Sequence, residues 1–397
     1  MPGHPPNTDR TSLPIAAPAR MLVRGVNWLG DAVMTTPALQ RIRERFPSAQ
    51  ITLLAPEKLA GLWLHHPSLD RVLTFAPGEQ VWSVARRLRA ENFDLALVLP
   101  NSPRSALEAW LAGIPQRLGY ARRWRSWFLT HPIPARPGHV RMRKLSPREI
   151  SRLINLPAAH TRHAASHTPA ASHQIHEYLN LAAALGANPE PLAPSLAVTP
   201  QEVATIVAKF DLGALSPSGP ILGLNPGAEY GPAKRWPAER FIAAAREIQE
   251  RTNCAWLIFG GRSDIATANA IQAALHSTLR APHTALLNLA GQTSLRELMG
   301  LLKICRVVLT NDTGPMHLAA ALGTAVVAPF GSTSPELSGP GLPGDSSHCL
   351  LRSSAPCSPC FRRACPIDFR CMTDITVERV VEAVVSSATR SPTRPVS

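Results

Sequence analysis

Residues 21–39, MLVRGVNWLGDAVMTTPAL, predict the first strand, loop and helix of an α/β fold. The apolar run 21–26 suits a buried strand, and residues 32–45 carry apolar side chains at helical spacing. Asp31 lies between them, at the expected start of the helix. Asp31 is either a cap for the free backbone N–H groups of that helix or a base directed at a substrate. Its position alone does not distinguish these two roles.

The alternation of strand and helix continues through the first half of the chain. We expect further strands at 51–54, 72–75 and 93–99, and helices at 81–89 and 174–185. This order is typical of a parallel sheet that is covered by helices on both faces.

The second half of the chain repeats the pattern. Residues 305–323, CRVVLTNDTGPMHLAAALG, read as a strand, a tight loop and a helix, and 254–261 and 325–331 read as strands. We therefore expect two Rossmann-like domains with a boundary near 186–200. The expected division is a disordered tail 1–20, a first domain 21–186 with a flexible His/Ala-rich insertion 157–173, a linker 187–200, a second domain 201–375, a closing helix 376–387 and a disordered tail 388–397.

The composition favours an anionic partner. Lys and Arg number 41 against 27 Asp and Glu, which gives a formal net charge of +14. Such a surplus suits nucleic acid, an acidic lipid surface or a phosphorylated substrate. No run of about 18 apolar residues is present, and residues 1–20 lack the pattern of a secretory signal. We therefore expect a cytoplasmic protein without a membrane span.

Two loops of the second half suit an anionic ligand. Residues 310–317, TNDTGPMH, join a strand to a helix, and the free N–H groups at such a helix start can bind an anion. Residues 225–237, NPGAEYGPAKRWP, also join a strand to a helix and carry Lys234. Neither loop is a P-loop or a dinucleotide fingerprint. At this level Asp312 can equally be a helix cap, and 225–237 a solvated basic loop.

Four ordered motifs carry a resemblance to a known family. They are GVNWLGDAVMTTPAL, LPNSPRSALEAWLAGIPQRLGY, NPGAEYGPAKRWPAERF and TNDTGPMHLAAALGTAVVAPFG, and the similarity runs from about residue 21 to 385. The chain resembles glycosyltransferase family 9 and, within it, the lipopolysaccharide heptosyltransferases, most closely those of type II.

The resemblance implies a fold and an activity. The expected GT-B fold has two Rossmann-like domains that face each other across a cleft, with the acceptor on the first and the nucleotide sugar on the second. The last helix is expected to cross back to the first domain. The implied reaction is transfer of L-glycero-D-manno-heptose from ADP-heptose, with inversion, to the first heptose of the lipopolysaccharide inner core. The implied place is the cytoplasmic face of the inner membrane, and we expect a monomer that binds no nucleic acid.

The resemblance also assigns catalytic and donor-binding residues. Asp31 is implied as the base, with a pKa that the helix N-terminus lowers, and Lys234 as the cation that stabilises the leaving ADP. No metal is then required for transfer. Asp312 is expected either to bind hydroxyl groups of the sugar or to fix the conformation of the loop 310–317. The donor-binding residues are expected to be Gly227, Ala228, Glu229, Lys234, Gly260, Gly261, Asp312, Thr313, Gly314 and His317.

Basic residues of the first half are candidates for the anionic acceptor. These candidates are Arg104, Arg117, Arg122 and Arg123, with Arg125 nearby, and the polar Asn101 is a further acceptor candidate. Trp124, Trp127 and Phe128 suggest that the same surface docks on a membrane. An ordinary basic face over buried aromatic residues is the alternative.

Cysteines cluster near the end of the chain, in CSPCFRRACPIDFRC. Their short spacing in a chain without a secretory signal favours a structural zinc or iron–sulfur site over disulfides, with unpaired thiols as the alternative. The candidate ligands are Cys357, Cys360, Cys365 and Cys371.

Rival functions remain at this level. One is a family 9 transferase with another donor or acceptor, including heptosyltransferase I, and another is a nucleotide-sugar epimerase of the same fold. A basic, metal-stabilised nucleic-acid-binding protein would explain the charge and the cysteines. It would leave the two Rossmann-like halves without a purpose, and no recognition helix or stacking motif is present.

Overall fold

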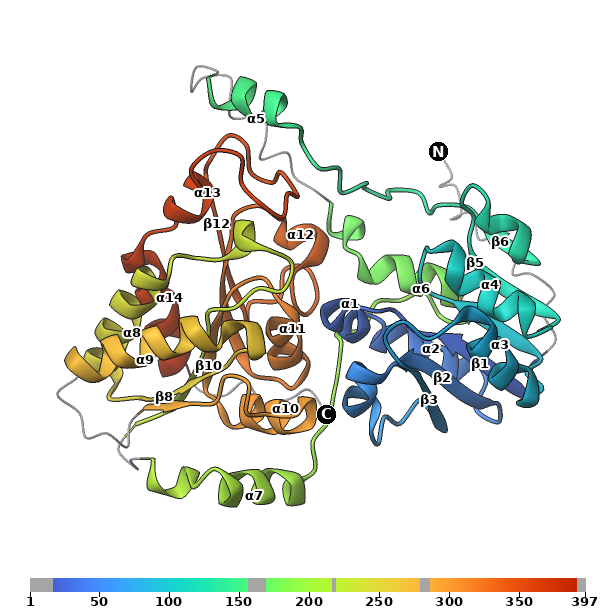
Figure 1. Cartoon of the computed structure of the whole chain (residues 1–397), viewed down its shortest axis with the longest axis horizontal. Coiled ribbons are helices and arrows are strands. Elements are labelled where there is room, and N and C mark those ends of the chain that lie inside the picture. The colour runs from blue at the N-terminus through green and yellow to red at the C-terminus, as the bar shows by residue number, and fades with distance from the viewer. Residues whose placement is uncertain (1–16, 156–168, 216–218, 279–285, 391–397) are drawn as a thin grey trace, which may run out of the picture.

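The computed structural model describes residues 17–155, 169–215, 219–278 and 286–390 (Figure 1). Most of the expected insertion and both chain ends therefore lie outside the described residues. Within the described part, the chain forms two six-stranded sheets, each followed and covered by helices. The expected α/β fold of two halves is confirmed.

All strands of the first sheet are parallel, in the order β3-β2-β1-β4-β5-β6. The strands are β1 Arg20–Arg24, β2 Gln50–Pro56, β3 Arg71–Phe75, β4 Leu95–Val98, β5 Gln116–Tyr120 and β6 His131–Ile133. The chain moves outward from β1 in one direction and then resumes at β4 on the other side. Ligands of such sheets bind where this reversal occurs, beyond the carboxyl ends of the two central strands.

The second sheet repeats this plan, with parallel strands in the order β12-β11-β10-β7-β8-β9. The strands are β7 Ile221–Asn225, β8 Ala255–Ile258, β9 Leu286–Asn288, β10 Val307–Thr310, β11 Ala325–Phe330 and β12 Cys349–Arg352. Its reversal lies between β7 and β10, so the loops 226–237 and 311–313 leave the sheet side by side.

The helices connect these strands. In the first half and the linking segments they are α1 Leu29–Met34, α2 Thr36–Arg45, α3 Val81–Ala90, α4 Pro103–Leu111, α5 Pro147–Ile154, α6 Ile175–Ala183 and α7 Pro200–Lys209. In the second half they are α8 Ala238–Thr252, α9 Ile265–Thr278, α10 Leu295–Ile304, α11 Gly314–Ala321, α12 Pro335–Ser338, α13 Arg370–Thr373 and α14 Val377–Thr389.

The helix expected at 32–45 is split into α1 and α2 at Thr35. Pro37 has no N–H to donate to the carbonyl oxygen of Val33, and the Thr36 hydroxyl donates to that oxygen instead, at 2.9 Å. The break makes α1 a separate short helix, which carries Asp31 to the junction of the two halves.

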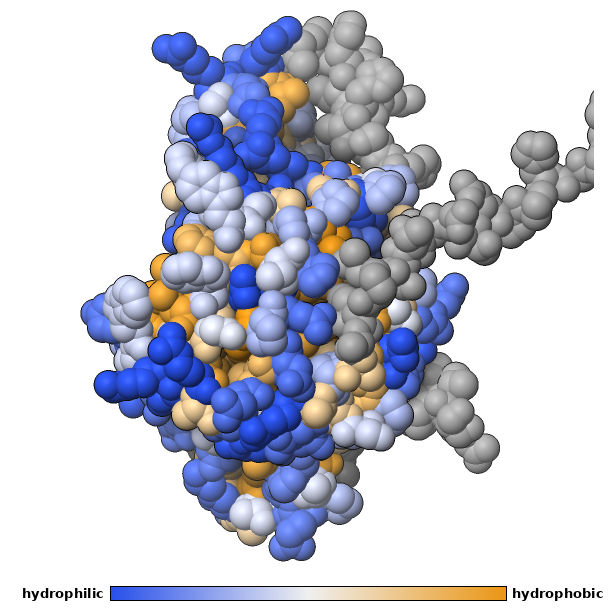
Figure 2. Space-filling view, turned by 90° about the vertical axis from the view of Figure 1, so that its right-hand side faces the viewer, coloured by the Kyte–Doolittle hydropathy of each residue, from blue (hydrophilic) through white to orange (hydrophobic). Residues whose placement is uncertain are grey.

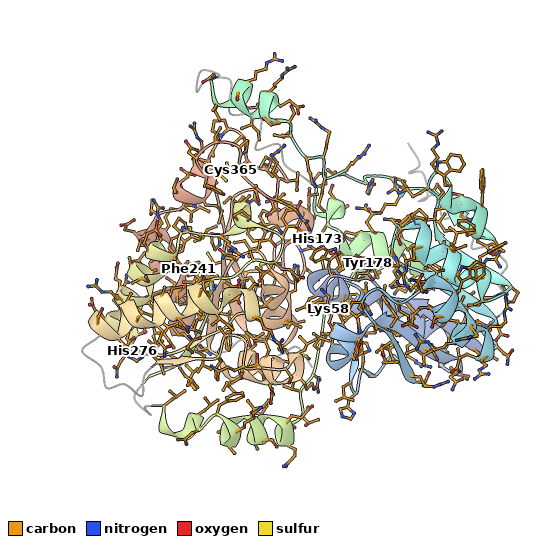
Figure 3. All side chains as sticks on the ribbon, viewed as in Figure 1. Lys58, His173, Tyr178, Phe241, His276 and Cys365 are labelled. Atoms are coloured by element: carbon orange, nitrogen blue, oxygen red, sulfur yellow. The ribbon has the colours of Figure 1, made fainter. Side chains whose placement is uncertain are left out.

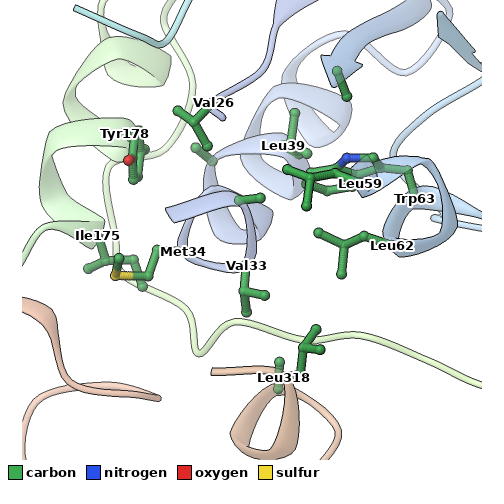
Figure 4. Close-up of a cluster of buried hydrophobic side chains, with 14 of the residues drawn as sticks. Val26, Val33, Met34, Leu39, Leu59, Leu62, Trp63, Ile175, Tyr178 and Leu318 are labelled. Atoms are coloured by element: carbon green, nitrogen blue, oxygen red, sulfur yellow. The ribbon is translucent and has the colours of Figure 1, made fainter. Parts of the chain in front are cut away.

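The two halves meet where α1 packs against α11. A Cβ atom on Gly30 would lie 2.7 Å from the imidazole Cδ2 of His317, and one on Gly314 would lie 2.7 Å from Cδ2 of Leu29. Glycine is therefore needed at both positions for the two helix starts to approach this closely. Figure 4 shows the core around this junction, with Val33 of α1 near Leu318 of α11.

The last helix, which we expected to pack on the first half, packs on the second half instead. Helix α14 packs on α8 and on β10, β11 and β12, because its buried face of Val380, Val381 and Val384 belongs to the core of the second half. The prediction that this helix returns to the first half is wrong, because its main contacts are with α8 and the second sheet. Helix α5 crosses instead and lies over the second half (Figure 1). Its Ile150 is buried in the core of that half.

Among the described residues, no helix is long and apolar enough to cross a bilayer.

Candidate functional site

A cleft of about 900 Å³ lies between the two halves, at the carboxyl ends of the central strands of the second sheet. Its wall includes α1, the loops after β7, β8 and β10, and the start of α11. Cavities of this size accommodate a nucleotide-sized ligand. Figure 3 shows Lys58, His173 and Tyr178 near this junction, with Lys58 and Tyr178 contributed by the first half and its adjoining helix α6.

The structure brings all the predicted catalytic and donor-binding residues to this cleft. Those lining it are Asp31, Gly227, Ala228, Glu229, Lys234, Gly260, Gly261, Asp312, Thr313, Gly314 and His317. These residues come from four separate segments of the sequence, namely Asp31, 227–234, 260–261 and 312–317, and the fold brings the segments together. Their roles as binding and catalytic groups stay predictions.

Asp31 faces the cleft and does not cap its helix. Helix α1 begins after Trp28 without a side-chain cap, and the Asp31 carboxylate accepts a hydrogen bond of 3.1 Å from Nε2 of Gln174. Burial raises the pKa of Asp31 to about 6, while the hydrogen bond from Gln174 and the charge of Lys234 act to lower it. The expected lowering of this pKa is wrong, because the loss of hydration outweighs the favourable groups around the carboxylate.

The raised pKa matters for proton transfer. At pH 7 a carboxyl with a pKa of about 6 is still ionised in roughly ten molecules of eleven. It is also a stronger base than an ordinary aspartate, so it matches the requirements of a general base near neutral pH.

Lys234 and Asp312 form an ion pair across the two donor loops. Nζ of Lys234 lies 2.6 Å from Oδ2 of Asp312, and the Thr333 hydroxyl donates to the same oxygen at 2.6 Å. Both charged side chains are largely buried. Asp312 therefore positions the ammonium group of Lys234 in the cleft, in keeping with the expectation that Asp312 holds the loop.

Two buried asparagines join the same loops. Nδ2 of Asn225 donates to Thr310 and Thr313 at 2.9 and 3.2 Å, and Asn311 donates to the carbonyl oxygen of Pro226 at 2.7 Å. Asn311 also accepts from the backbone N–H of Trp236 at 2.9 Å. These amides fix the loop that carries Lys234 against the start of α11. Sequence reasoning missed both, although Asn225 opens the NPGAEYG motif.

His317 is buried at the contact of α11 with Gly30. Burial lowers its pKa to about 4, so the imidazole is neutral at pH 7. It can donate or accept a hydrogen bond in the cleft, and it brings no positive charge to a phosphate.

The candidate acceptor residues do not line the cleft. Nε of Arg104 pairs with Glu108 at 2.9 Å, and Nε of Arg117 donates to the carbonyl oxygen of Phe128 at 2.7 Å. Arg122 and Arg123 are exposed outside the cleft, as is Asn101. Nearby, Arg125 is wholly buried and donates to the backbone carbonyl oxygen of Val98 in β4 at 3.1 Å and to that of Pro100 just after β4 at 2.8 Å.

Cys357, Cys360 and Cys365 lie in the loop between β12 and α13, and Cys371 lies in α13 itself. Their thiols are free, and all but the half-buried Cys365 are buried. Among the described residues, no group of three or more His, Cys, Asp or Glu side chains is arranged so that it could hold a metal ion. The zinc or iron–sulfur site therefore stays a prediction.

Comparisons with known proteins agree with this geometry. The model of glycosyltransferase family 9 (heptosyltransferase) matches residues 81–146 and 148–369. The lipopolysaccharide heptosyltransferase 2 of Salmonella typhimurium is 31% identical over 334 residues, which cover 81% of this chain and 85% of that one. The lipooligosaccharide heptosyltransferase 2 of Haemophilus influenzae is 30% identical over 331 residues, with the same coverage of both chains.

The fold is also similar to that of a solved relative. The structure of E. coli ADP-heptose lps heptosyltransferase II superposes with a TM-score of 0.71 at 27% identity, and the match covers 93% of this chain and 98% of that one. The expected GT-B arrangement of two facing α/β halves is thereby confirmed. The chain belongs to glycosyltransferase family 9, the heptosyltransferase family.

Proposed function

We propose that the protein transfers L-glycero-D-manno-heptose from ADP-heptose, with inversion, to the first heptose of the lipopolysaccharide inner core. The observation that carries this proposal is the placement of Asp31 on one side of a cleft whose other side bears Lys234 and the start of α11. The type 2 heptosyltransferases among the relatives support the choice of donor and acceptor.

Inversion at the anomeric carbon requires a single displacement. Asp31 accepts the proton of the attacking acceptor hydroxyl as its oxygen bonds to the anomeric carbon, and the bond from that carbon to the diphosphate oxygen breaks. General base action of this kind typically supplies ~10²–10⁴-fold in rate. No covalent intermediate with the enzyme is needed, in contrast to retaining glycoside hydrolysis.

The departing ADP gains negative charge on its terminal phosphate oxygen. Lys234 and the backbone N–H groups at the start of α11 supply fixed positive charge and dipoles there. Asp312 keeps Lys234 in place before the reaction, so little reorganisation is required when charge develops. We propose that these groups fulfil the role of a divalent cation in other transferases, so that transfer needs no added metal.

A direct assay tests the proposed function. Incubation of the protein with ADP-heptose and heptosyl-Kdo₂-lipid A should yield a product heavier by one heptose, in buffer with EDTA as well as without it. Mass spectrometry of the acceptor provides the measurement. Transfer to Kdo₂-lipid A alone would instead indicate a type I activity, and no mass gain on either acceptor would contradict the proposal.

The pH dependence tests the environment of Asp31. Because the base must be ionised, kcat/KM should fall as the pH drops through about 6. The hydrogen bond from Gln174 lowers the pKa of Asp31. In Gln174→Leu, the fall of kcat/KM at acidic pH should therefore occur at a higher pH than in the wild type.

Gln40→Leu, an exchange on the exposed face of α2, provides the matched control and should leave the pH at which kcat/KM falls unchanged. If the pH profile of kcat/KM is unchanged in Gln174→Leu, a group other than Asp31 causes the loss of activity at acidic pH.

We also propose that the first half docks on the inner membrane. Four exposed tryptophans lie on the neighbouring elements α3 and α4 and in or just before the 3₁₀ turn Arg125–Phe128, and we call them the tryptophan patch. They are Trp82, Trp110, Trp124 and Trp127, exposed by 71%, 47%, 58% and 73%. Figure 2 views this end of the molecule, where hydrophilic side chains surround smaller apolar areas. Indole rings beside basic residues suit the interface of an anionic bilayer.

Vesicle flotation tests the docking. The double variant Trp124→Ser/Trp127→Ser should bind phosphatidylglycerol-containing vesicles at least several-fold more weakly than the wild type, because two interfacial rings are lost. Leu64→Ser, which removes an exposed apolar side chain outside the tryptophan patch, should bind normally. Equal binding by all three proteins would contradict the proposal.

A further inference from the structure

We propose that Arg363 and Lys144 form an anion-binding site in the cleft that holds a carboxylate or phosphate group of the acceptor. The identity of the ligand rests on the proposed function, whereas the site itself rests on the contacts described below. Neither residue belongs to the motifs that carry the family resemblance.

The cysteine loop, residues 353–369, is attached directly to the loop that carries Lys234. The backbone N–H of Ala233 donates to the carbonyl oxygen of Arg363 at 3.0 Å, and the Tyr230 hydroxyl donates to that of Phe361 at 2.9 Å. Phe361 and Arg363 thereby become part of the cleft wall. The cysteine loop thus forms part of the cleft through its own side chains.

The guanidinium group of Arg363 lies within cation–π distance of an aromatic ring from each half. Its Cζ is 5.1 Å from the ring centre of Tyr230 in the second half and 5.9 Å from that of Trp28 in the first. Contacts with ring faces hold a guanidinium in place and leave its N–H donors available for a bidentate bond to an anion.

Arg363 differs from Lys234 in its partners. Lys234 is paired with the carboxylate of Asp312. Within the part of the chain that the structure describes, no carboxylate forms an ion pair with Arg363 or Lys144. Both are exposed residues that line the cleft, so their charges are open to a ligand.

Lys144 reaches the cleft from the segment that crosses between the halves. The backbone N–H of Leu145 donates to the carbonyl oxygen of Cys360 at 3.0 Å, and Nη1 of Arg362 donates to the carbonyl oxygen of Leu145 at 2.8 Å. These two bonds fix the crossing segment to the cysteine loop next to Arg363. Two cations from distant parts of the sequence are thereby held at one cleft.

The position of Arg363 favours the acceptor over the donor. The start of α11 and Lys234 already provide for the diphosphate, whereas Trp28 directly precedes the helix that carries Asp31. An anion on Arg363 would therefore lie next to the wall of the cleft that the first half contributes and that carries Asp31. The arginines first expected to bind the acceptor, such as Arg104 and Arg117, are occupied by partners outside the cleft.

The test compares Arg363→Gln with Arg370→Gln. Arg370 follows on from the same loop, is paired with Asp368 at 2.8 Å and does not line the cleft, so its exchange controls for the loss of one charge. Binding of ADP and binding of O-deacylated heptosyl-Kdo₂-lipid A are each measured by calorimetry without turnover. Lys144→Gln, on the crossing segment, provides a second, independent variant.

Arg363→Gln should weaken acceptor binding by about 10- to 100-fold, the range for loss of a charge-assisted hydrogen bond, with the ADP dissociation constant within about twofold of the wild type. Lys144→Gln should weaken acceptor binding in the same direction, and Arg370→Gln should change neither affinity. Acceptors with methyl-esterified carboxylates or without phosphates then identify the group, because the matching acceptor should no longer distinguish Arg363→Gln from the wild type.

Weakened ADP binding in Arg363→Gln would assign the residue to the donor and overturn the proposal, as would unchanged acceptor binding in both cleft variants. Because the readout is binding, it is separate from the transfer assay. A wild-type protein that binds the acceptor through Arg363 and transfers no heptose would refute the proposed function and leave the anion site standing.

Discussion

The close contact of α1 with α11 is the constraint on which the site depends. Gly30 and Gly314 have no Cβ, and any larger residue at either position would meet a side chain of the opposite half at 2.7 Å. Overpacking of such contacts typically costs ~1–3 kcal/mol and forces the backbones apart. The contact sets two helix starts side by side, one carrying Asp31 and the other presenting the backbone N–H groups beside Asp312. The separation of base and leaving group is therefore built into the packing of the two halves.

Electrostatics in the cleft follow from this packing. Asp31, Lys234 and Asp312 act on one another, and Asp31 is also removed from much of its hydration. Burial alone would push the carboxyl towards its neutral form, and Gln174 and Lys234 oppose that push. The balance leaves a base that is ionised near neutral pH yet more basic than an exposed aspartate. Gln174 comes from a linking segment more than a hundred residues away, which is why no local motif shows its role.

The sequence predicted those features that local pattern controls. Apolar runs marked the strands, and the loops 225–237 and 310–317 stood out because each follows a strand and precedes a helix. Their meeting at one cleft follows from the parallel order of the strands, a general property of such sheets. The resemblance supplied the identity of Asp31 and Lys234 as catalytic candidates, which pattern alone left open.

Local sequence pattern could not predict features that depend on which groups a side chain contacts in the folded protein. Arg104 and Arg117 were predicted to bind the acceptor. In the structure Arg104 pairs with the carboxylate of Glu108, and Arg117 donates to the backbone carbonyl oxygen of Phe128. The basicity of Asp31 was predicted in the wrong direction, because the sequence shows the helix start but not the burial. The crossing of α5 to the second half depends on Ile150 finding a place in a distant core. Arg363 lies between Cys360 and Cys365 in the sequence, where nothing indicates a ligand site, whereas in space it lies near Tyr230 and Trp28.

The central claim is that Asp31 acts as the base across the cleft from the donor site. Single-turnover transfer by Asp31→Asn, with both substrates saturating, tests it most directly, because the amide keeps the size of the side chain and cannot accept the proton. The account predicts a rate at least ~10²-fold below that of the wild type, with ADP affinity and melting temperature nearly unchanged. A variant that transfers heptose within a few-fold of the wild-type rate would show that Asp31 is not the base.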